Sequence, residues 1–254
     1  MKGYSEVNGL RMYYEIHGQG KPLVLIHGGG STIQTSFGNI IPLLSKKRQV
    51  IALELQAHGR TGDRESFLNF AQDASDVAQL LKNLNIQKAD FLGFSNGGHT
   101  LIELALKHSQ WINKIILAST FYKRNAAAPE FWSGFDYTTI DMMPKPLIDG
   151  FLAVNNNRSA LQNMFDKDVQ RMKFFEEWTD EQIMSIKLPT LIINGNLDVG
   201  SIEHATVMHR LISNSGLVIL PGSHGEYLGA VEALDEGKWD HPYVVGIIEE
   251  FLDK

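Results

Sequence analysis

One short segment, Gly93-Phe94-Ser95-Asn96-Gly97-Gly98, limits what this chain can fold into more than any other feature of the sequence. An apolar run over 89–92 precedes it, and a helical pattern over 96–108 follows it. A G-x-S-x-G pentapeptide between a strand and a helix forms a sharp turn that exposes the serine hydroxyl. We therefore expect Ser95 to stand clear of the backbone and to face a cleft.

The glycines around Ser95 have a steric purpose. A residue at such a turn is held in a strained conformation, often with positive φ. The residues two positions before and after it, Gly93 and Gly97, then approach each other too closely for side chains. Gly98 is expected to give the following helix room to pack on its strand.

Length and composition exclude several classes of protein. The 254 residues, 43% of them hydrophobic, suffice for one large α/β domain, or for a core with a modest insertion. A net charge of −6 with dispersed Lys and Arg argues against a nucleic-acid partner. The chain has no cysteine, which excludes a disulfide framework, a thiolate nucleophile and a Cys-ligated metal.

The N-terminus and the hydropathy pattern predict a cytoplasmic protein. Residues 1–6 lack the apolar stretch of a signal peptide. No apolar run approaches the roughly 20 residues that cross a membrane as a helix. We expect no membrane partner, and the sequence does not indicate an oligomeric state.

Strand-like and helix-like segments alternate along most of the chain. Strands are expected over 11–17, 22–27, 49–53, 91–94, 114–118, 189–193 and 217–220, and helices over 36–44, 69–84, 96–108, 202–212 and 243–252. This alternation predicts an α/β fold with a mostly parallel central sheet and helices on both faces. Residues 1–120 and 188–254 would form this core domain.

The alternation stops between residues 121 and 187. This segment has no convincing strand and is rich in Phe, Trp and Met within helix-like stretches. It predicts a helical insertion whose apolar side chains either line a pocket or form the insertion's own core.

A reactive serine needs a base and a carboxylate that orients the base. With this serine turn the chain order is serine, acid, histidine. His224 follows the last strand in a turn-rich loop, where open α/β sheets place their chemistry, and is the predicted base. His241 is the alternative, whereas His204 and His209 are interpreted as ordinary residues of a helix.

The predicted orienting carboxylate is Asp198. It follows the strand over 189–193 and a tight turn. Some chains with this turn carry the acid after the preceding strand instead, but residues 118–122 contain no carboxylate. That absence favours Asp198.

Attack on a carbonyl creates an oxyanion, which needs hydrogen-bond donors already in place. The main-chain N–H of Asn96, at a helix N-terminus, is one predicted donor. The second is the N–H of Gly29 in the glycine-rich segment 27–30, with Gly30 as the alternative.

Five segments together resemble the α/β-hydrolase superfamily. They are His27-Gly28-Gly29-Gly30, Ala57-His58-Gly59-Arg60-Thr61, Gly93-x-Ser95-x-Gly97, Gly195-Asn196-Leu197-Asp198 and Gly222-Ser223-His224, in the family's order and at its usual separations. The resemblance implies the α/β-hydrolase fold, a small helical cap over 121–187, and a catalytic triad of Ser95, Asp198 and His224.

The chain departs from the family pattern at two places. Glu54 and Ala57 replace the usual Asp and Gly, in a segment interpreted as structural. The segment 235–241 looks inserted, and it either edges the mouth of the active site or forms a plain surface loop.

The resemblance implies a serine hydrolase that cleaves a small-molecule carboxylic ester through an acyl-enzyme, without cofactor or metal. An apolar or aromatic acyl group would lie under the cap. A C–C bond hydrolase, a lactonase, a thioesterase and a perhydrolase fit the same triad, as does a ligand receptor with little turnover. Activity is expected to fall at acid pH as His224 becomes protonated.

Overall fold

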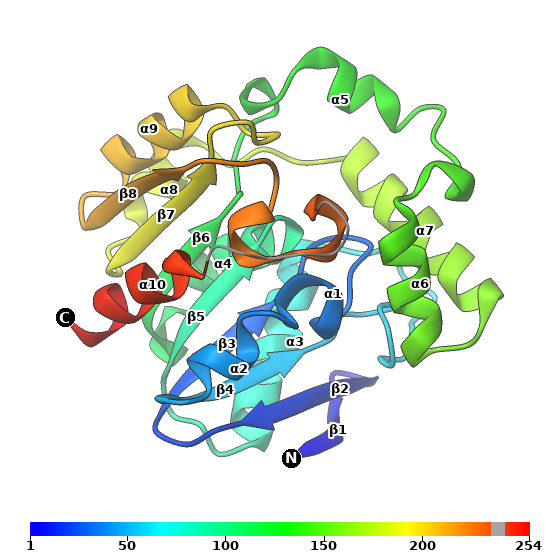
Figure 1. Ribbon diagram of the computed structural model, residues 1–254, viewed down its shortest axis with the longest axis horizontal. Helices are drawn as coiled ribbons and strands as arrows, with labels where there is room; N and C mark the ends of the chain where they lie inside the picture. The colour runs from blue at the N-terminus through cyan, green and yellow to red at the C-terminus, as the bar shows by residue number, and fades with distance from the viewer. Residues whose placement is uncertain (235–241) are drawn as a thin grey trace.

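A central sheet organises the protein, for which the computed structural model describes residues 1–234 and 242–254. Within these residues the sheet has eight strands in the order β1-β2-β4-β3-β5-β6-β7-β8 (Figure 1). The strands are β1 (Lys2–Val7), β2 (Leu10–His17), β3 (Lys21–Ile26), β4 (Arg48–Leu53), β5 (Ala89–Phe94), β6 (Ile112–Ala118), β7 (Thr190–Gly195) and β8 (Ser215–Leu220).

The sheet is mostly parallel, as predicted. Strands β1 and β2 pair antiparallel, and so do β2 and β4. Every neighbouring pair from β4 through β3, β5, β6 and β7 to β8 is parallel. The carboxyl ends of these six strands therefore lie along one edge, where α/β sheets carry their sites.

The sequence analysis assigned no strand to residues 2–7, and that assignment was wrong. This segment is the edge strand β1, paired with β2 over its whole length. Of its side chains only that of Val7 is buried. A strand with so little apolar surface lacks the hydrophobic pattern on which the sequence assignment relied.

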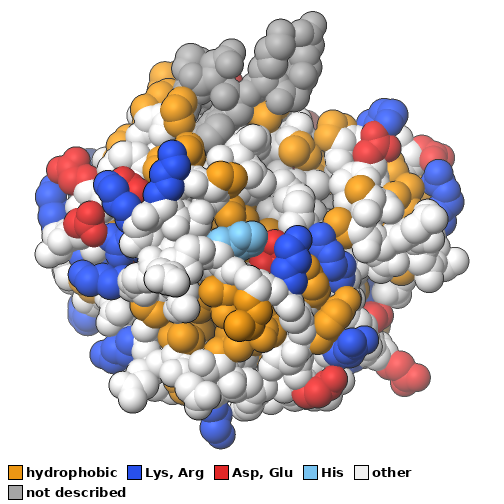
Figure 2. All heavy atoms as spheres, turned by 60° about the horizontal axis from the view of Figure 1, so that its bottom comes forward, with side chains coloured by type: hydrophobic (Ala, Val, Ile, Leu, Met, Phe, Trp, Pro, Cys, Tyr) orange, Lys and Arg blue, Asp and Glu red, His pale blue; other side chains and the backbone are white. Residues whose placement is uncertain are grey.

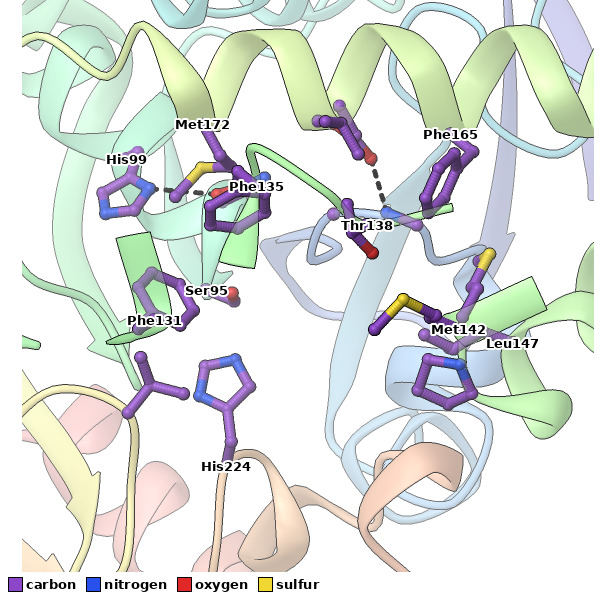
Figure 3. Close-up of a pocket in the computed structure, with 18 of the residues that line it drawn as sticks. Ser95, His99, Phe131, Phe135, Thr138, Met142, Leu147, Phe165, Met172 and His224 are labelled. Atoms are coloured by element: carbon purple, nitrogen blue, oxygen red, sulfur yellow. Dashed lines mark hydrogen bonds between the residues drawn. The ribbon is translucent and has the colours of Figure 1, made fainter. Parts of the chain in front are cut away.

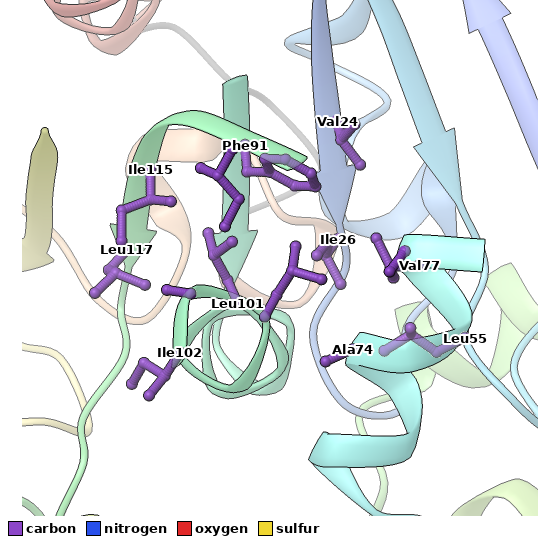
Figure 4. Close-up of a cluster of buried hydrophobic side chains, with 14 of the residues drawn as sticks. Val24, Ile26, Leu55, Ala74, Val77, Phe91, Leu101, Ile102, Ile115 and Leu117 are labelled. Atoms are coloured by element: carbon purple, nitrogen blue, oxygen red, sulfur yellow. The ribbon is translucent and has the colours of Figure 1, made fainter. Parts of the chain in front are cut away.

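Helices cover both faces of the sheet. Val24 and Ile26 of β3 pack with α3 (Phe70–Asn83) and α4 (Asn96–Lys107), in a cluster that also reaches α9 (Ile202–Leu211) (Figure 4). The alternate residues Leu23 and Leu25 pack on the other face with α1 (Ile33–Phe37), α2 (Ile41–Leu44) and α10 (Tyr243–Asp253). Such alternation is expected of a strand buried on both faces.

The helix expected over 36–44 is two short helices instead. Helix α1 ends at Phe37 with Gly38 as its C-cap, and α2 begins at Ile41. Pro42 has no N–H to donate, and its ring would clash with the carbonyl four residues earlier, at Gly38. The chain therefore leaves the helical path between Gly38 and Ile40.

Residues 121–187, all of them described, contain helices and no strand. They form α5 (Pro129–Gly134), α6 (Lys145–Val154), α7 (Arg158–Lys173) and α8 (Asp180–Ser185). Helices α5, α6 and α7 lie together away from the helices that flank the sheet (Figure 1). A small apolar cluster joins α6 to α7, made of Ala57, Met143, Leu147, Phe151, Leu161 and Met164. We refer to residues 121–187 as the cap, and their status as a separate unit stays a prediction.

Charged and hydrophobic side chains are distributed unevenly over the surface. On the face drawn in Figure 2, basic and acidic side chains are interspersed around the rim, and hydrophobic ones gather nearer the centre. Among the described residues, none of the helices is both long and apolar enough to cross a membrane.

The turn at Ser95 is strained and is held by close backbone contacts. Ser95 has φ 53° and ψ −121° between β5 and α4. A Cβ added to Gly97 would lie 2.0 Å from the carbonyl oxygen of Ile26, and one added to Gly93 would lie 2.4 Å from that of Gly97. The predicted need for glycine on both sides of Ser95 is thus confirmed.

Two helical glycines offer a direct test of this packing. Gly97→Ala should lower the free energy of unfolding by about 1–3 kcal/mol, because its Cβ meets backbone that cannot move aside. Gly246→Ala is the matched control, since Gly246 is exposed in α10 with open space around it. It should raise stability by about 0.5–1 kcal/mol. Urea denaturation measures both, and equal effects would contradict the close approach.

Candidate active site

A cavity of about 300 Å³ lies between the carboxyl edge of the sheet and the cap (Figure 3). The predicted residues Ser95, Asn96, Gly29 and His224 all line it. Most of the remaining lining residues come from the cap and are apolar or aromatic: Phe131, Phe135, Met142, Met143, Pro144, Leu147, Phe165, Val169 and Met172. The cavity is therefore a mainly apolar chamber with a few polar groups at one end.

Ser95 is fixed by its main chain. Its N–H donates to the carbonyl of Ala118 at the end of β6 (2.9 Å), and its carbonyl accepts from Gly98 in the first turn of α4 (2.8 Å). Figure 3 shows the Ser95 hydroxyl beside the open space, with Phe131 and His224 nearby. The neighbouring strand and the helix thus determine where the hydroxyl points.

His224 and Asp198 are brought together from two neighbouring strand ends. His224 Nδ1 lies 2.6 Å from Asp198 Oδ1. Asp198 follows β7, and His224 lies in the loop after β8, where Gly222 and Gly225 take positive φ. Because a carboxylate only accepts, the proton of this bond is on Nδ1, which makes Nε2 the basic nitrogen of the neutral ring.

The Asp198 carboxylate is held as an anion although it is buried. Burial by itself would raise the pKa of Asp198, but the hydrogen bond and charge of His224 lower it below its usual value, with help from Ser119 and Gly195. Oδ2 accepts from Ser119 Oγ (2.5 Å) and from the Gly195 N–H (3.1 Å). The Val199 N–H donates to Oδ1 (2.8 Å).

The sequence analysis missed Ser119 and Tyr227. Ser119 follows β6 with a φ of 51°, an unusual conformation for serine. Its N–H donates to Ile193 (2.8 Å), and its hydroxyl lies 2.7 Å from that of Tyr227. In the sequence, only a carboxylate in this loop was considered as a candidate. The available signal was a small polar residue at the end of the strand over 114–118, which neighbours the strand that precedes Asp198.

The two candidate donors in the glycine-rich segment differ in their partners. The Gly30 N–H donates to Asp168 Oδ2 on α7 (2.6 Å). Among the described residues we find no acceptor for the Gly29 N–H. Asn96 begins α4, where an N–H has no acceptor within the helix. The geometry therefore favours Gly29 over Gly30 as the partner of Asn96.

His99 lines the same cavity one turn after Ser95. Its Nδ1 lies 3.2 Å from Asn96 Oδ1, and aromatic rings surround it, among them Phe121 and Phe175. Burial lowers the pKa of His99 to about 3. The ring is thus a neutral, polar patch in an apolar wall, and no feature of the sequence pointed to it.

His204 and His209, interpreted from the sequence as ordinary helix residues, do not line this cavity. His204 is buried on α9, where Nε2 accepts from the Tyr122 N–H (3.2 Å), and His209 contacts Ser215. His241 and the inserted segment 235–241 lie outside the described residues. In the described part of the chain, no cluster of His, Asp or Glu is arranged to hold a metal ion.

Comparison with known proteins agrees with this architecture. A family model for the alpha/beta hydrolase fold matches residues 21–174, more than half of the chain. Serine hydrolase BPHL of Homo sapiens is 27% identical over 246 residues, which cover 87% of this chain and 79% of that protein. The 2-hydroxy-6-oxo-6-(2'-aminophenyl)hexa-2,4-dienoic acid hydrolase of Metapseudomonas resinovorans is 24% identical over 240 residues, covering 86% and 82%.

The fold is also that of solved hydrolase structures. A serine hydrolase involved in carbazole degradation, the CarC enzyme, matches with a TM-score of 0.80 at 21% identity, covering 100% of this chain and 98% of the other. The chain therefore belongs to the α/β-hydrolase family. The predicted family and fold class are confirmed.

The buried neutral histidines predict how stability depends on pH. Burial lowers the pKa of both His27 and His99 to about 3. Below about pH 6.5 these histidines are protonated in the unfolded chain but stay neutral in the folded chain. The free energy of unfolding therefore decreases as the pH is lowered. Each such group adds up to about 1.4 kcal/mol per pH unit to that slope.

Removing one of these groups should make the slope shallower. We expect His99→Phe to reduce the loss of unfolding free energy between pH 6 and pH 4, measured by urea titration at each pH. His209→Asn, at a half-buried ring on α9, is the control. The assignment of His99 as a buried neutral base would be wrong if both variants kept the slope of the parent protein.

Proposed function

We propose that this chain is a serine-dependent hydrolase of neutral small-molecule carboxylic esters. Ser95 is the nucleophile, His224 the general base and Asp198 the residue that orients the base. The observation that carries this proposal is the anchored His224–Asp198 pair, whose imidazole opens on the cavity that Ser95 lines. The known hydrolases among the relatives support the reaction class.

The proposed reaction has two halves. Nε2 of His224 takes the Ser95 proton as Oγ attacks the ester carbonyl, and the tetrahedral intermediate then expels the alcohol, which leaves with that proton. Water, deprotonated by the same Nε2, attacks the acyl-enzyme and releases the carboxylic acid and free Ser95. Asp198 stabilises the imidazolium that forms in each half.

The negative charge on the carbonyl oxygen is proposed to be held by the main-chain N–H groups of Gly29 and Asn96. Both residues line the cavity beside Ser95. The N-terminal position of Asn96 in α4 adds a favourable helix dipole. Fixed donors in a mainly apolar chamber stabilise this charge more strongly than water does.

The cavity supports an uncharged, apolar acyl group. Among the described residues, the charged or titratable side chains that line it are His99, His224 and Asp168, and none is Lys or Arg. A substrate carboxylate buried there would meet no cation, at a cost of several kcal/mol. The apolar wall of Phe, Met and Leu side chains instead fits an alkyl or aryl group.

The absence of Lys and Arg from the described cavity lining also bears on the choice between ester hydrolysis and C–C bond hydrolysis. One relative is named as a dienoic acid hydrolase, so its named substrate carries a carboxylate. C–C hydrolysis of such an acid stays the second candidate because the reacting groups would be the same. The lack of a basic side chain in the described cavity favours neutral esters. Lactones, thioesters and peracid formation need no basic group and remain within the proposed chemistry.

Replacing the nucleophile tests the proposal directly. Ser95→Ala should lower kcat for p-nitrophenyl butyrate by about 10³–10⁶-fold, as in other serine triads, and should abolish labelling by a fluorophosphonate probe. Stopped-flow absorbance and gel fluorescence measure the two effects. Retained turnover in the variant would refute the role of Ser95. Tight ligand binding without turnover in the parent protein would instead indicate a receptor.

The charge of the acyl group offers a second test. The p-nitrophenyl ester of butyric acid should be hydrolysed with a kcat/KM at least about 10-fold above that of the mono-p-nitrophenyl ester of glutaric acid, because a buried, unpaired carboxylate is costly. Both esters release the same chromophore, so the rates compare directly. Preference for the glutarate ester, or faster turnover of a dienoic acid, would contradict the proposed substrate class.

A further inference from the structure

Asp168 connects the cap to the glycine-rich loop of the catalytic edge. It lies on α7, and its Oδ2 accepts from the Gly30 N–H (2.6 Å) and contacts His58 Nε2 (2.8 Å). The carboxylate is largely buried yet lines the cavity. Gly30 has a φ of 65°, so its N–H is aimed by a turn that glycine adopts easily.

His58 meets this carboxylate as a cation. Its Nδ1 lies 2.8 Å from the Gln56 carbonyl, and its Nε2 lies 2.8 Å from Asp168. Both partners are acceptors, so both ring nitrogens must donate. Burial would lower the pKa of His58, but the charge and hydrogen bond of Asp168 raise it above its ordinary value. The charged ring is held entirely inside the protein.

Arg171 completes the compensation one turn along α7. Its guanidinium donates to Asp168 Oδ1 and to Asp73 Oδ2 on α3 (2.9 Å for the latter). Burial raises the pKa of Asp73 to about 6, so above that pH His58 and Arg171 carry two positive charges against the two negative charges of Asp168 and Asp73. Burial would raise the pKa of Asp168, but Arg171 and His58 keep it well below its usual range.

We propose that Asp168 is a positioning residue for ester hydrolysis: by accepting the Gly30 N–H it orients the loop so that the Gly29 N–H faces the oxyanion. This inference rests on the proposed function. The Gly30 amide, the alternative donor, is engaged by the carboxylate, whereas the Gly29 amide is left for the substrate oxygen. A displacement of about 1 Å in such a donor costs roughly 100-fold in rate.

The charges around Asp168 are what make this arrangement compatible with catalysis. A Cβ on Gly29 would lie 3.4 Å from Asp168 Oδ2, so the carboxylate is close to the place where negative charge would develop. An uncompensated anion there would oppose the reaction. His58 and Arg171 cancel its charge, while Oδ2 keeps its role as acceptor.

The position of Asp168 also ties the loop to the cap. Gly30 belongs to the segment after β3, and Asp168 belongs to α7, 138 residues further along the chain. Movement of α7 away from the sheet would remove the acceptor from the Gly30 N–H. The alignment of the proposed oxyanion donors therefore depends on α7 staying packed against the glycine-rich loop.

Steady-state kinetics with p-nitrophenyl butyrate test the assignment. Asp168→Leu should lower kcat by about 10–100-fold with KM changed less than about threefold, because donors that act in the transition state are misplaced. Asp168→Asn keeps an acceptor for Gly30 and should lose less. Met164→Ala is the matched control, because it removes a buried side chain of α7 outside the cavity. It should lower the melting temperature and leave kcat near that of the parent.

A transition-state mimic provides a second readout. A trifluoromethyl ketone that adds to Ser95 should bind Asp168→Leu more weakly by the same factor as the loss in kcat/KM, whereas the product butyrate should bind both proteins equally. A loss of kcat in Met164→Ala as large as that in Asp168→Leu would overturn the proposal, since loosening of the cap would then explain both. An unchanged kcat in Asp168→Leu would overturn it as well.

Hydrogen exchange separates this proposal from the proposed function. The amides of residues 28–31 should exchange faster in Asp168→Leu than in the parent, and those of Met164→Ala should match the parent. This arm does not require ester turnover. A parent protein without esterase activity but with this exchange pattern would refute the proposed function alone. Normal esterase activity with unchanged exchange in Asp168→Leu would refute the positioning role alone.

Discussion

The close approach of Gly97 to the carbonyl oxygen of Ile26 is the contact on which the site depends. It lets α4 start directly behind β5 and forces Ser95 into a conformation that serine rarely adopts, with φ 53°. That strain costs of order 1–3 kcal/mol and persists because the surrounding strands and helix leave no alternative. The serine hydroxyl is thereby placed by backbone packing rather than by its own side-chain contacts.

The buried titratable groups follow two different electrostatic solutions. His27 and His99 form no ion pair with the described residues, and burial keeps them neutral. Asp198 and Asp168 are also buried, but each accepts several hydrogen bonds and stays ionised. A carboxylate that remains charged can stabilise a neighbouring imidazolium, whereas a neutral ring cannot. The two carboxylates that stay ionised, Asp198 and Asp168, are those that contact His224 and His58.

Much of the architecture could be predicted from local patterns. The buried parallel strands are continuous apolar runs, the serine turn has its own glycine pattern, and both polar loops follow strands. The edge strand β1 could not be found in this way, because an edge buries little. The break between α1 and α2 was in principle readable from Gly38 and Pro42.

The parts of the site that were missed depend on tertiary contacts. Asp168 lies on an ordinary-looking helix, and only folding brings it to Gly30, 138 residues earlier. His58 belongs to one of the family-like segments, but its sequence neighbours do not specify an anion beside it. Ser119 was not predicted, because only a carboxylate was considered as a partner of the histidine. The spacing of motifs predicts which residues lie together at the carboxyl edge of the sheet. It does not predict which side chains of the cap, such as Asp168, contact that edge.

The chamber walls and the proposed reacting groups come from different stretches of chain. Ser95, Asp198 and His224 stand at strand ends, while most apolar wall residues belong to 121–187. Replacement of wall side chains can therefore change which molecules are accepted while the machinery at the strand ends stays intact. Asp168 on α7 is the exception, because its carboxylate accepts from the Gly30 N–H, which belongs to the loop lining the same cavity. In this chain the side chains of 121–187 can thus vary along most of the cavity wall without touching the strand ends, whereas a change at Asp168 reaches the Gly30 amide.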